Sequence, residues 1–447
     1  MYNENFIRDI GTKIIEYSKA QQTEVFIYGN LSSLSRFSEN EITQNVTQED
    51  INISVRVIHN NRIGKATTNR IDDPSLKQLA SNAFEIALFQ KEDKSITPLP
   101  EHQEYEEIKD TYDKETADYS AMDRAKAIKS VTDECEKQEI NAAGIFSNNT
   151  VYICLMNSKG LYAYNKFTGA EFSITATKNK RAGWAEKTVK KVKDINTLDI
   201  ANIAIKKSID GQNPSIIEPG KYTVVLEPAA VTDFISYLSF LGFGALSHIE
   251  KRSLFSGKIG EKVFSDNITI SDDAYYPISQ GIPFDFEGMP RKRITLIENG
   301  VLKGIVYDLK TAKIAGTEST GHGLPQPNEC GPMPLNLVLK PGNATIREMI
   351  ESTKKGLLIT HFHYTNVLNP KEMIITGMTR DGVFLIENGE VKKPVNNMRF
   401  TESIPNIFKN VEMVGKKAIL QSSFFGNGFV IPGLKVNNFT FTSKTDF

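Results

Sequence analysis

The 447-residue sequence has few of the features that assign a chain to a special class. It has three cysteines, Cys135, Cys154 and Cys330, which are too few and too widely spaced for a disulfide framework. Its formal net charge of -1 gives no general reason to expect binding to nucleic acid or to an anionic membrane. No apolar run approaches the roughly 18 residues of a membrane span. These absences predict a reduced, cytoplasmic protein that does not bind a membrane.

The hydrophobic periodicity predicts an α+β fold whose first part covers residues 1–215. The N-terminal segment has the pattern of an amphipathic helix and lacks the apolar core of a signal peptide. A charged, proline-broken segment at about 91–113 is expected to be a linker. Helices are expected over 5–20, from Asp73 onward and over 113–138, and strands over 24–28, 33–38, 52–59, 62–69, 150–156 and 160–177. Turns are expected at Gly29-Asn30 and Asn60-Asn61.

The second part, residues 216–447, is predicted to be mostly β with a few helices. A boundary is expected in the turn-rich segment 210–220, before a strand at 222–226 and a helix that Pro228 opens. The pentapeptide LIENG occurs at 296–300 and again at 385–389. Asn and Gly tolerate the positive φ angles of a type I′ turn, so each copy predicts a hairpin.

The stretch GALSHIEKRSLFSGKIGE, from Gly244 to Glu261, has part of the pattern of a zinc-protease helix. That pattern needs two histidines on one helix face and a glutamate beside the metal-bound water. His248 could be the first ligand, but Ile249 follows it, and neither Arg252 nor Ser253 supplies an imidazole. We therefore expect a degenerate zinc-helix region at His248, Ile249 and Ser253, with no metal bound there.

A second candidate for metal binding is the pair His361 and His363. Residues i and i+2 of a strand point to the same side, so both imidazoles could reach one ion. His322, in the sequence Gly-His-Gly, and Cys330 could complete such a site. No spacing argument brings His322 or Cys330 near the pair, and histidines on a half-exposed strand explain the pattern equally well.

Basic residues also gather around Trp184, the only tryptophan. A basic patch with an aromatic residue is typical of nucleic-acid binding, although a solvated hairpin explains the same run. The basic residues are Lys178, Lys180, Arg181, Lys187, Lys190, Lys191 and Lys193. Because the chain as a whole is not basic, we do not expect nucleic acid as a partner.

Taken in order, short motifs along nearly the whole chain resemble the TldD/PmbA (TldE) family. This family has long been labelled as modulators of DNA gyrase and is understood as zinc metalloprotease components. The matching motifs are EV at 24–25, RFSEN at 36–40, SVRV at 54–57, IGKATTN at 63–69, SLFSGKIGE at 253–261, TGHG at 320–323, PMPLN at 332–336, LIENG at 385–389 and VG at 414–415.

The resemblance implies which of the family's two subunit types this chain is. TldD-like chains carry His-Glu-x-x-x-His on a helix and a cysteine near the C-terminus, and these hold the zinc. Here the first motif fails at Ile249 and Ser253, and no cysteine follows Gly415, where residues 422–428 read SSFFGNG. The resemblance therefore implies a TldE/PmbA-like subunit with no catalytic residue and no cofactor of its own.

The same resemblance implies the partners. A TldD-like zinc metalloprotease subunit would hold the zinc, and an extended peptide would be the substrate; a homodimer could form in isolation. Two alternatives remain at this point. The chain could be a peptidase in its own right with a rearranged metal site around His361 and His363, or a nucleic-acid-associated, gyrase-modulating regulator.

Overall fold

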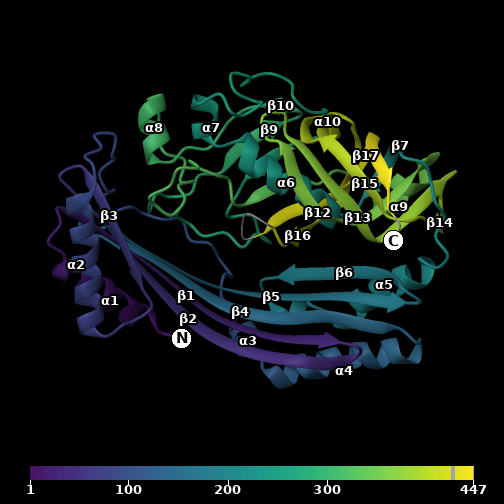
Figure 1. The fold of residues 1–447 in the computed structure, drawn as a ribbon, viewed down its shortest axis with the longest axis horizontal. Coiled ribbons are helices and arrows are strands. Elements are labelled where there is room, and N and C mark those ends of the chain that lie inside the picture. Colours follow the sequence, from purple (N-terminus) through teal and green to yellow (C-terminus); the bar gives the residue numbers. More distant parts are fainter. Residues whose placement is uncertain (424–427, 446–447) are drawn as a thin grey trace.

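The computed structural model describes residues 1–423 and 428–445 and shows the α+β fold that the sequence predicts. Two sheets organise the molecule, one antiparallel sheet in the N-terminal part and a larger mixed sheet in the C-terminal part. In Figure 1 the N-terminal sheet, coloured purple to teal, curves beneath the green and yellow C-terminal part.

The N-terminal sheet has six antiparallel strands, several of them unusually long. In spatial order they are β3 (Arg62–Thr68), β2 (Glu41–His59), β1 (Gln22–Ser38), β4 (Asn141–Asn157), β5 (Tyr162–Lys178) and β6 (Arg181–Val189). β6 is therefore an edge strand, and Figure 1 shows it as the strand of this sheet closest to the C-terminal part.

The predicted turn at Gly29-Asn30 is wrong, because β1 continues through it as one strand. Gly29 pairs with Ile51 on β2 and with Tyr152 on β4. A Cβ atom at Gly29 would lie 2.0 Å from the Tyr152 ring, so the glycine makes room for this ring within the sheet. The turn predicted at Asn60-Asn61 is confirmed, and both residues have positive φ angles, 48° and 55°.

Helices cover the N-terminal sheet and bury two apolar clusters against it. They are α1 (Glu4–Tyr17), α2 (Asp73–Phe89), α3 (Lys114–Ala117), α4 (Ala121–Lys137), the 3-10 turn Val192–Asp194 and α5 (Thr197–Asp210). The single helix predicted over 113–138 is divided into α3 and α4, because Ser120 and Asp123 form a capping box that starts α4 afresh.

The C-terminal sheet is partly closed on itself, because β17 pairs with both β15 and β7. The strands are β7 (Gly220–Leu226), β8 (Ile270–Asp272), β9 (Ile294–Glu298), β10 (Val301–Leu302), β11 (Leu337–Leu339), β12 (Lys355–Asn369), β13 (Ile374–Glu387), β14 (Glu390–Pro394), β15 (Met398–Ser403), β16 (Val411–Gln421) and β17 (Phe429–Lys444). β17, β15, β13, β12 and β7 form the closed part.

The C-terminal helices are short except for α6, which packs against β12, β16 and β17. They are α6 (Pro228–Gly242), α7 (Ala245–Ile249), α8 (Leu309–Ala315), α9 (Ile346–Glu351) and α10 (Ile404–Lys409). Phe234 of α6 is fully buried among Phe362, Phe400 and Phe439. Its burial fixes the helix on the sheet.

Both predicted LIENG hairpins are confirmed. The first joins β9 to β10 through Asn299 and Gly300, and the second joins β13 to β14 through Asn388 and Gly389. All four turn residues have positive φ angles between 47° and 79°, as a type I′ turn requires.

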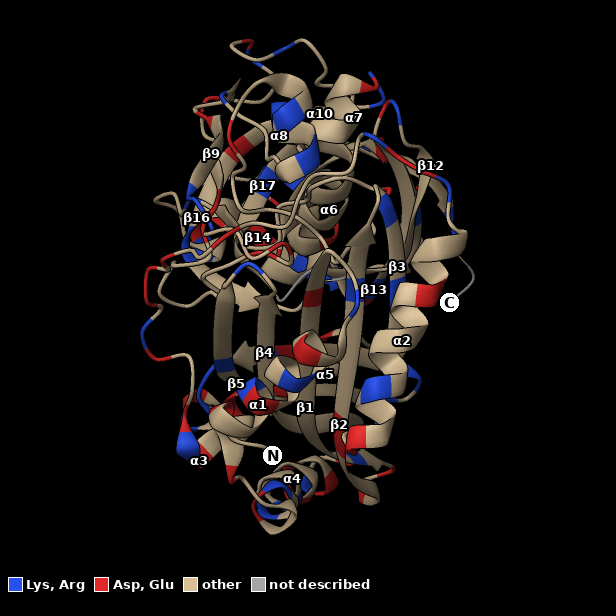
Figure 2. Ribbon diagram, turned by 90° about the vertical axis from the view of Figure 1, so that its left-hand side faces the viewer, with Lys and Arg blue, Asp and Glu red and all other residues tan. Residues whose placement is uncertain are grey.

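The surface carries charges of both signs. Figure 2 shows Lys and Arg interspersed with Asp and Glu along the ribbon, for example on α2 and α4. None of the helices in the described part of the chain has the length and apolar character needed to cross a membrane.

Candidate functional site

The degenerate zinc-helix region lies at the end of a helix of five residues, α7. His248 Nε2 lies 2.7 Å from the carbonyl oxygen of Gly242, and Ser253 Oγ donates a hydrogen bond of 3.0 Å to the same oxygen. Ile249, where the zinc motif needs its glutamate, is 40% exposed. Burial lowers the pKa of His248. These side chains stabilise the chain after α6 rather than converging on a metal position.

A structural or catalytic zinc needs three or four convergent nitrogen, sulfur or oxygen ligands. In residues 1–423 and 428–445, no group of three or more His, Cys, Asp or Glu side chains is placed to hold a metal ion. The described residues therefore do not fit a zinc centre. The segment 422–428, where the family's late cysteine is missing, lies partly outside the described residues.

The structure separates the histidines proposed as an alternative metal site. His361 and His363 lie on the same side of β12, with Phe362 buried on the other. His322 is completely buried elsewhere, with Nε2 3.0 Å from Asp272 Oδ1 and Nδ1 2.8 Å from the Thr320 carbonyl oxygen. Both His322 ring nitrogens are thus engaged. Cys330 is exposed.

His361 instead belongs to a contact between the two parts of the molecule. Its ring stacks on Trp184 of β6, with the ring centroids 4.4 Å apart. His361 Nε2 also lies 3.2 Å from Asp381 Oδ2. A neighbouring ion pair, Lys207 with Glu227, joins α5 to the start of α6 at 2.6 Å. β6 and α5 are therefore held against the C-terminal part by aromatic and charged contacts.

A buried carboxyl group, Asp233 of α6, lies beside this contact. Burial raises the pKa of Asp233 to about 6, while the hydrogen bond from Thr365 and the nearby His361 lower it by smaller amounts. Thr365 Oγ1 donates to Asp233 Oδ2 at 2.6 Å. Tyr237, one turn further along α6, donates to the Thr365 carbonyl oxygen at 2.5 Å. The polar face of α6 is thereby fixed to β12.

Across from α6, one face of the N-terminal sheet carries a row of polar side chains. The row crosses four neighbouring strands, β1, β4, β5 and β6, and Gln280 and Ser422 of the C-terminal part cover it. A cavity of about 200 Å³ lies over it. The residues of the row that line this cavity are Ser32, Ser147, Asn149, Glu171 and Thr188.

Glu186 of β6 adds a second carboxyl group to this face. Burial raises the pKa of Glu186 to about 8, the neighbouring Glu171 raises it further, and a hydrogen bond from Gln421 lowers it. Gln421 Nε2 donates to Glu186 Oε1 at 3.0 Å. Burial raises the pKa of Glu171 as well. Asp233, Glu171 and Glu186 thus give the space between the two parts three carboxyl groups that hold protons at unusually high pH.

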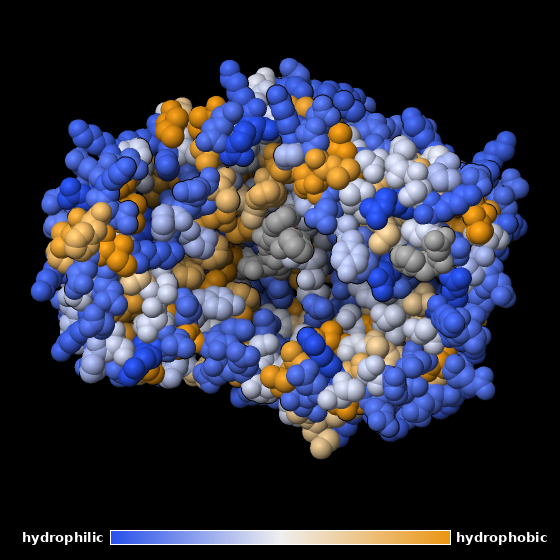
Figure 3. All heavy atoms as spheres, viewed as in Figure 1, coloured by the Kyte–Doolittle hydropathy of each residue, from blue (hydrophilic) through white to orange (hydrophobic). Residues whose placement is uncertain are grey.

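The molecule is hollowed between its two parts, and Figure 3 shows hydrophobic residues gathered in this hollow. A larger cleft of about 720 Å³ lies beside the polar row, and Thr188 lines both. This volume is typical of sites that bind small molecules or peptides, which range over roughly 300–1,000 Å³. The carboxyl groups and the cleft together form the candidate functional site.

The basic patch around Trp184 does not form one surface. Trp184 packs on His361, while Lys178 and Lys187 donate hydrogen bonds to the carbonyl oxygens of Gln138 and Asp194. Lys187, Lys190 and Lys191 line the larger cleft.

The sequence did not indicate that Glu171, Glu186 and Asp233 belong to the candidate site. A strand with polar residues at alternate positions, such as Glu186 and Thr188 of β6, ordinarily exposes that face to water. The signal that this face is covered comes from Gln421, which lies 235 residues later in the chain. No local pattern contains that information.

Comparison with known proteins agrees with this architecture. The PmbA/TldA metallopeptidase C-terminal domain matches residues 219–443, and the PmbA/TldA metallopeptidase domain 1 matches residues 23–87. The chain is 26% identical to Metalloprotease MJ0996 of Methanocaldococcus jannaschii, over 84% of this chain and 85% of that protein. It is 30% identical to the protein MJ0231 of the same organism, over 60% of this chain and 63% of that protein, which is less than two thirds of its length.

The fold is also that of a solved structure, TldE from Thermococcus kodakarensis. The two agree with a TM-score of 0.86, at 22% identity, over 98% of this chain and 100% of that one. The C-terminal domain match alone covers half of the chain and contains α6, the hairpins and β16. The chain therefore belongs to the PmbA/TldD metallopeptidase family.

Proposed function

We propose that this chain is a non-catalytic, TldE-like subunit of a cytoplasmic zinc metallopeptidase that cuts unfolded or extended peptides. A TldD-like partner would hold the zinc and the catalytic residues. This chain would form part of the wall of the chamber in which the peptide is cut. The proposal therefore assigns different roles to two related chains, catalysis to the partner and enclosure of the peptide to this chain.

One observation carries the proposal. His248 and Ser253, at the first and last positions of the His-Glu-x-x-x-His spacing, both bind the carbonyl oxygen of Gly242. The bond to Gly242 occupies His248 Nε2, and Ile249 and Ser253 supply neither the glutamate nor the second imidazole that the zinc motif needs. The resemblance to a solved TldE fold supports the same division.

The test is to purify this chain, a TldD-like chain from the same organism, and the two expressed together. We expect the chains to co-purify and the pair to cleave an unfolded peptide. Adding a chelator should abolish this cleavage, because the activity depends on the partner's metal. Chelator-sensitive cleavage by this chain alone would contradict the proposal.

The arrangement around His361 supports a second candidate, a peptidase in its own right. His361 contacts Asp381, and Asp233 lies close enough for their charges to interact. A histidine beside a carboxyl group can act as a general acid or base. This candidate requires that His361→Ala and His363→Ala each remove bound metal and activity. Unchanged metal content in both variants would eliminate it.

A further inference from the structure

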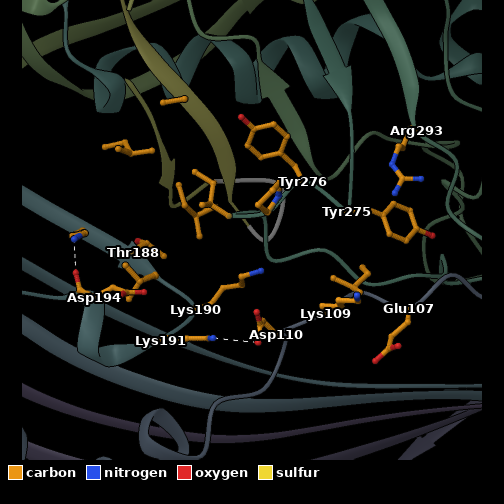
Figure 4. A pocket seen from close by; sticks show the side chains of 18 of the residues that line it. Glu107, Lys109, Asp110, Thr188, Lys190, Lys191, Asp194, Tyr275, Tyr276 and Arg293 are labelled. Carbon is orange, nitrogen blue, oxygen red and sulfur yellow. Dashed lines mark hydrogen bonds and ion pairs between the residues drawn. The ribbon is translucent and has the colours of Figure 1, made fainter. Parts of the chain in front are cut away.

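The larger cleft lies where the N-terminal linker, the edge of one sheet and the end of a strand of the other sheet meet. Residues 106–110 of the linker, 187–191 at the end of β6, 275–278 after β8, and 418–420 of β16 form its walls (Figure 4). Both β6 and β16 contribute residues to its lining, and β6 is an edge strand of its sheet.

Four charged side chains of the cleft form two ion pairs with each other. Arg293 forms two hydrogen bonds to Glu106, at 2.5 and 2.9 Å, and lies over the Tyr275 ring at 4.1 Å. Lys191 pairs with Asp110 at 3.3 Å. These contacts hold the linker against the end of β6 and against Arg293.

Lys190 differs from these residues. Figure 4 shows its side chain directed into the cleft, between the linker and Tyr276. Within the described residues, no hydrogen bond or ion pair is formed by its ammonium group. Burial lowers the pKa of Lys190, which Asp110 raises and Lys191 lowers by smaller amounts. A lysine that only guards a sheet edge keeps its ammonium group in water, so the inward direction of Lys190 needs another explanation.

Lys190 lies near the charges of Asp110 and Lys191, and the cleft also has an apolar wall. Val189, Ile278, Ile419 and Leu420 line the cleft, and Ile278 is 39% exposed. A partly desolvated ammonium group without a hydrogen-bond partner gains from a ligand of opposite charge, because attraction is stronger away from bulk water. An extended peptide suits both the apolar walls and the strand edge, since it can add main-chain hydrogen bonds to an edge strand.

We propose that this cleft binds an extended acidic peptide segment, with a side-chain carboxylate of the peptide on the ammonium group of Lys190. The apolar residues of the cleft take the peptide's alternate side chains, and the edge of β6 aligns its backbone. This inference rests on the proposed function in one respect, the extended peptide as substrate, and adds to it a preference for acidic sequence.

The test uses the purified full-length chain and two labelled peptides of equal length. One carries glutamate at alternate positions and the other carries glutamine there, and both have blocked termini so that only their side chains differ in charge. We expect the glutamate peptide to bind about tenfold more tightly, as a charge-assisted hydrogen bond implies. Fluorescence anisotropy of the labelled peptides measures both dissociation constants.

Variants of the chain test whether Lys190 causes the preference for the glutamate peptide. Lys190→Gln is expected to weaken binding of the glutamate peptide about tenfold and to leave the glutamine peptide unchanged. Lys190→Arg keeps the charge and should keep the preference. The matched control is Lys193→Gln, which removes an exposed lysine three residues further on and should change binding by less than about twofold. Thermal unfolding confirms that each variant is folded.

Equal affinity for the two peptides, or unchanged binding by Lys190→Gln, would overturn the inference. The inference would also be overturned if neither peptide bound to the chain. These results are distinct from a failure of the proposed function, which shows as loss of co-purification and of cleavage with the TldD-like chain.

Discussion

At the scale of single residues, the main finding is that carboxyl groups lie between the two parts of the molecule where the sequence shows ordinary polar positions. Glu186 and Asp233 approach this space from β6 and α6, and burial raises the pKa of each. With a pKa of about 8, Glu186 is mostly neutral at pH 7 and avoids the cost of a buried charge. Asp233, with a pKa of about 6, is mostly ionised at that pH and accepts the hydrogen bond from Thr365.

Glu186 makes stability depend on pH in a defined direction. Its pKa is about 8 in the folded protein against an ordinary value of 4.5, so between these values the folded state binds more protons than the unfolded state. The stability that the neutral carboxyl provides is complete below the ordinary value. It is lost as the pH rises through the folded value.

Glu186→Gln removes this dependence, because glutamine does not ionise and keeps an oxygen that can accept from Gln421. We expect the variant to gain about 2 kcal/mol in free energy of unfolding over the parent between pH 5 and pH 9. This is less than the full value of the shift, since the side chain keeps some access to water. Urea unfolding at both pH values measures it. The exposed control Glu261→Gln should show no such gain, and a pH-independent difference for Glu186→Gln would contradict the account.

At the scale of elements, local chemistry decided which predictions succeeded. The hairpin at Asn299-Gly300 was predictable because a type I′ turn needs positive φ angles, and Asn and Gly are the residues that adopt them most readily. The continuation of β1 through Gly29 was not predictable, because it depends on the ring of Tyr152, which lies far along the chain. The division between α3 and α4 could have been found from Ser120 and Asp123, which form a recognisable capping box.

The β9–β10 hairpin allows a matched test of turn chemistry against packing. Gly300 has φ 78°, and a Cβ atom there would lie 2.3 Å from the Phe264 carbonyl oxygen. Gly160 has φ 87°, but a Cβ atom there meets nothing within 4 Å. Both alanine variants therefore have the strain of a positive φ, about 1–2 kcal/mol, while Gly300→Ala also forces the backbone apart.

We expect Gly300→Ala to lower the free energy of unfolding by at least about 1 kcal/mol more than Gly160→Ala. Chemical denaturation of both variants under the same conditions checks this. Equal losses would show that the close approach to Phe264 does not contribute to stability.

At the scale of the whole molecule, the sequence predicted the α+β class and, through ordered motifs, the family. It could not predict how the two sheets face each other. That arrangement depends on contacts such as Trp184 with His361 and Lys207 with Glu227, between residues far apart in the chain. The candidate site lies at this junction. Local sequence patterns therefore could not predict that its carboxyl groups are buried.

The histidines also show what sequence spacing can and cannot predict. Spacing correctly predicted that His361 and His363 share a face of a strand. Spacing could not show that His322 binds Asp272 in the interior, or that His248 binds the carbonyl oxygen of Gly242. Both ring nitrogens of His322 are engaged in this way, and one ring nitrogen of His248 is.

The central claim is that this chain leaves the metal chemistry to a partner, and its zinc content tests that claim most directly. The isolated chain is incubated with zinc, loosely bound metal is removed, and zinc per chain is measured by elemental analysis. The account predicts far less than one zinc per chain, unchanged by His361→Ala or His248→Ala. One zinc per chain, lost in either variant, would contradict it.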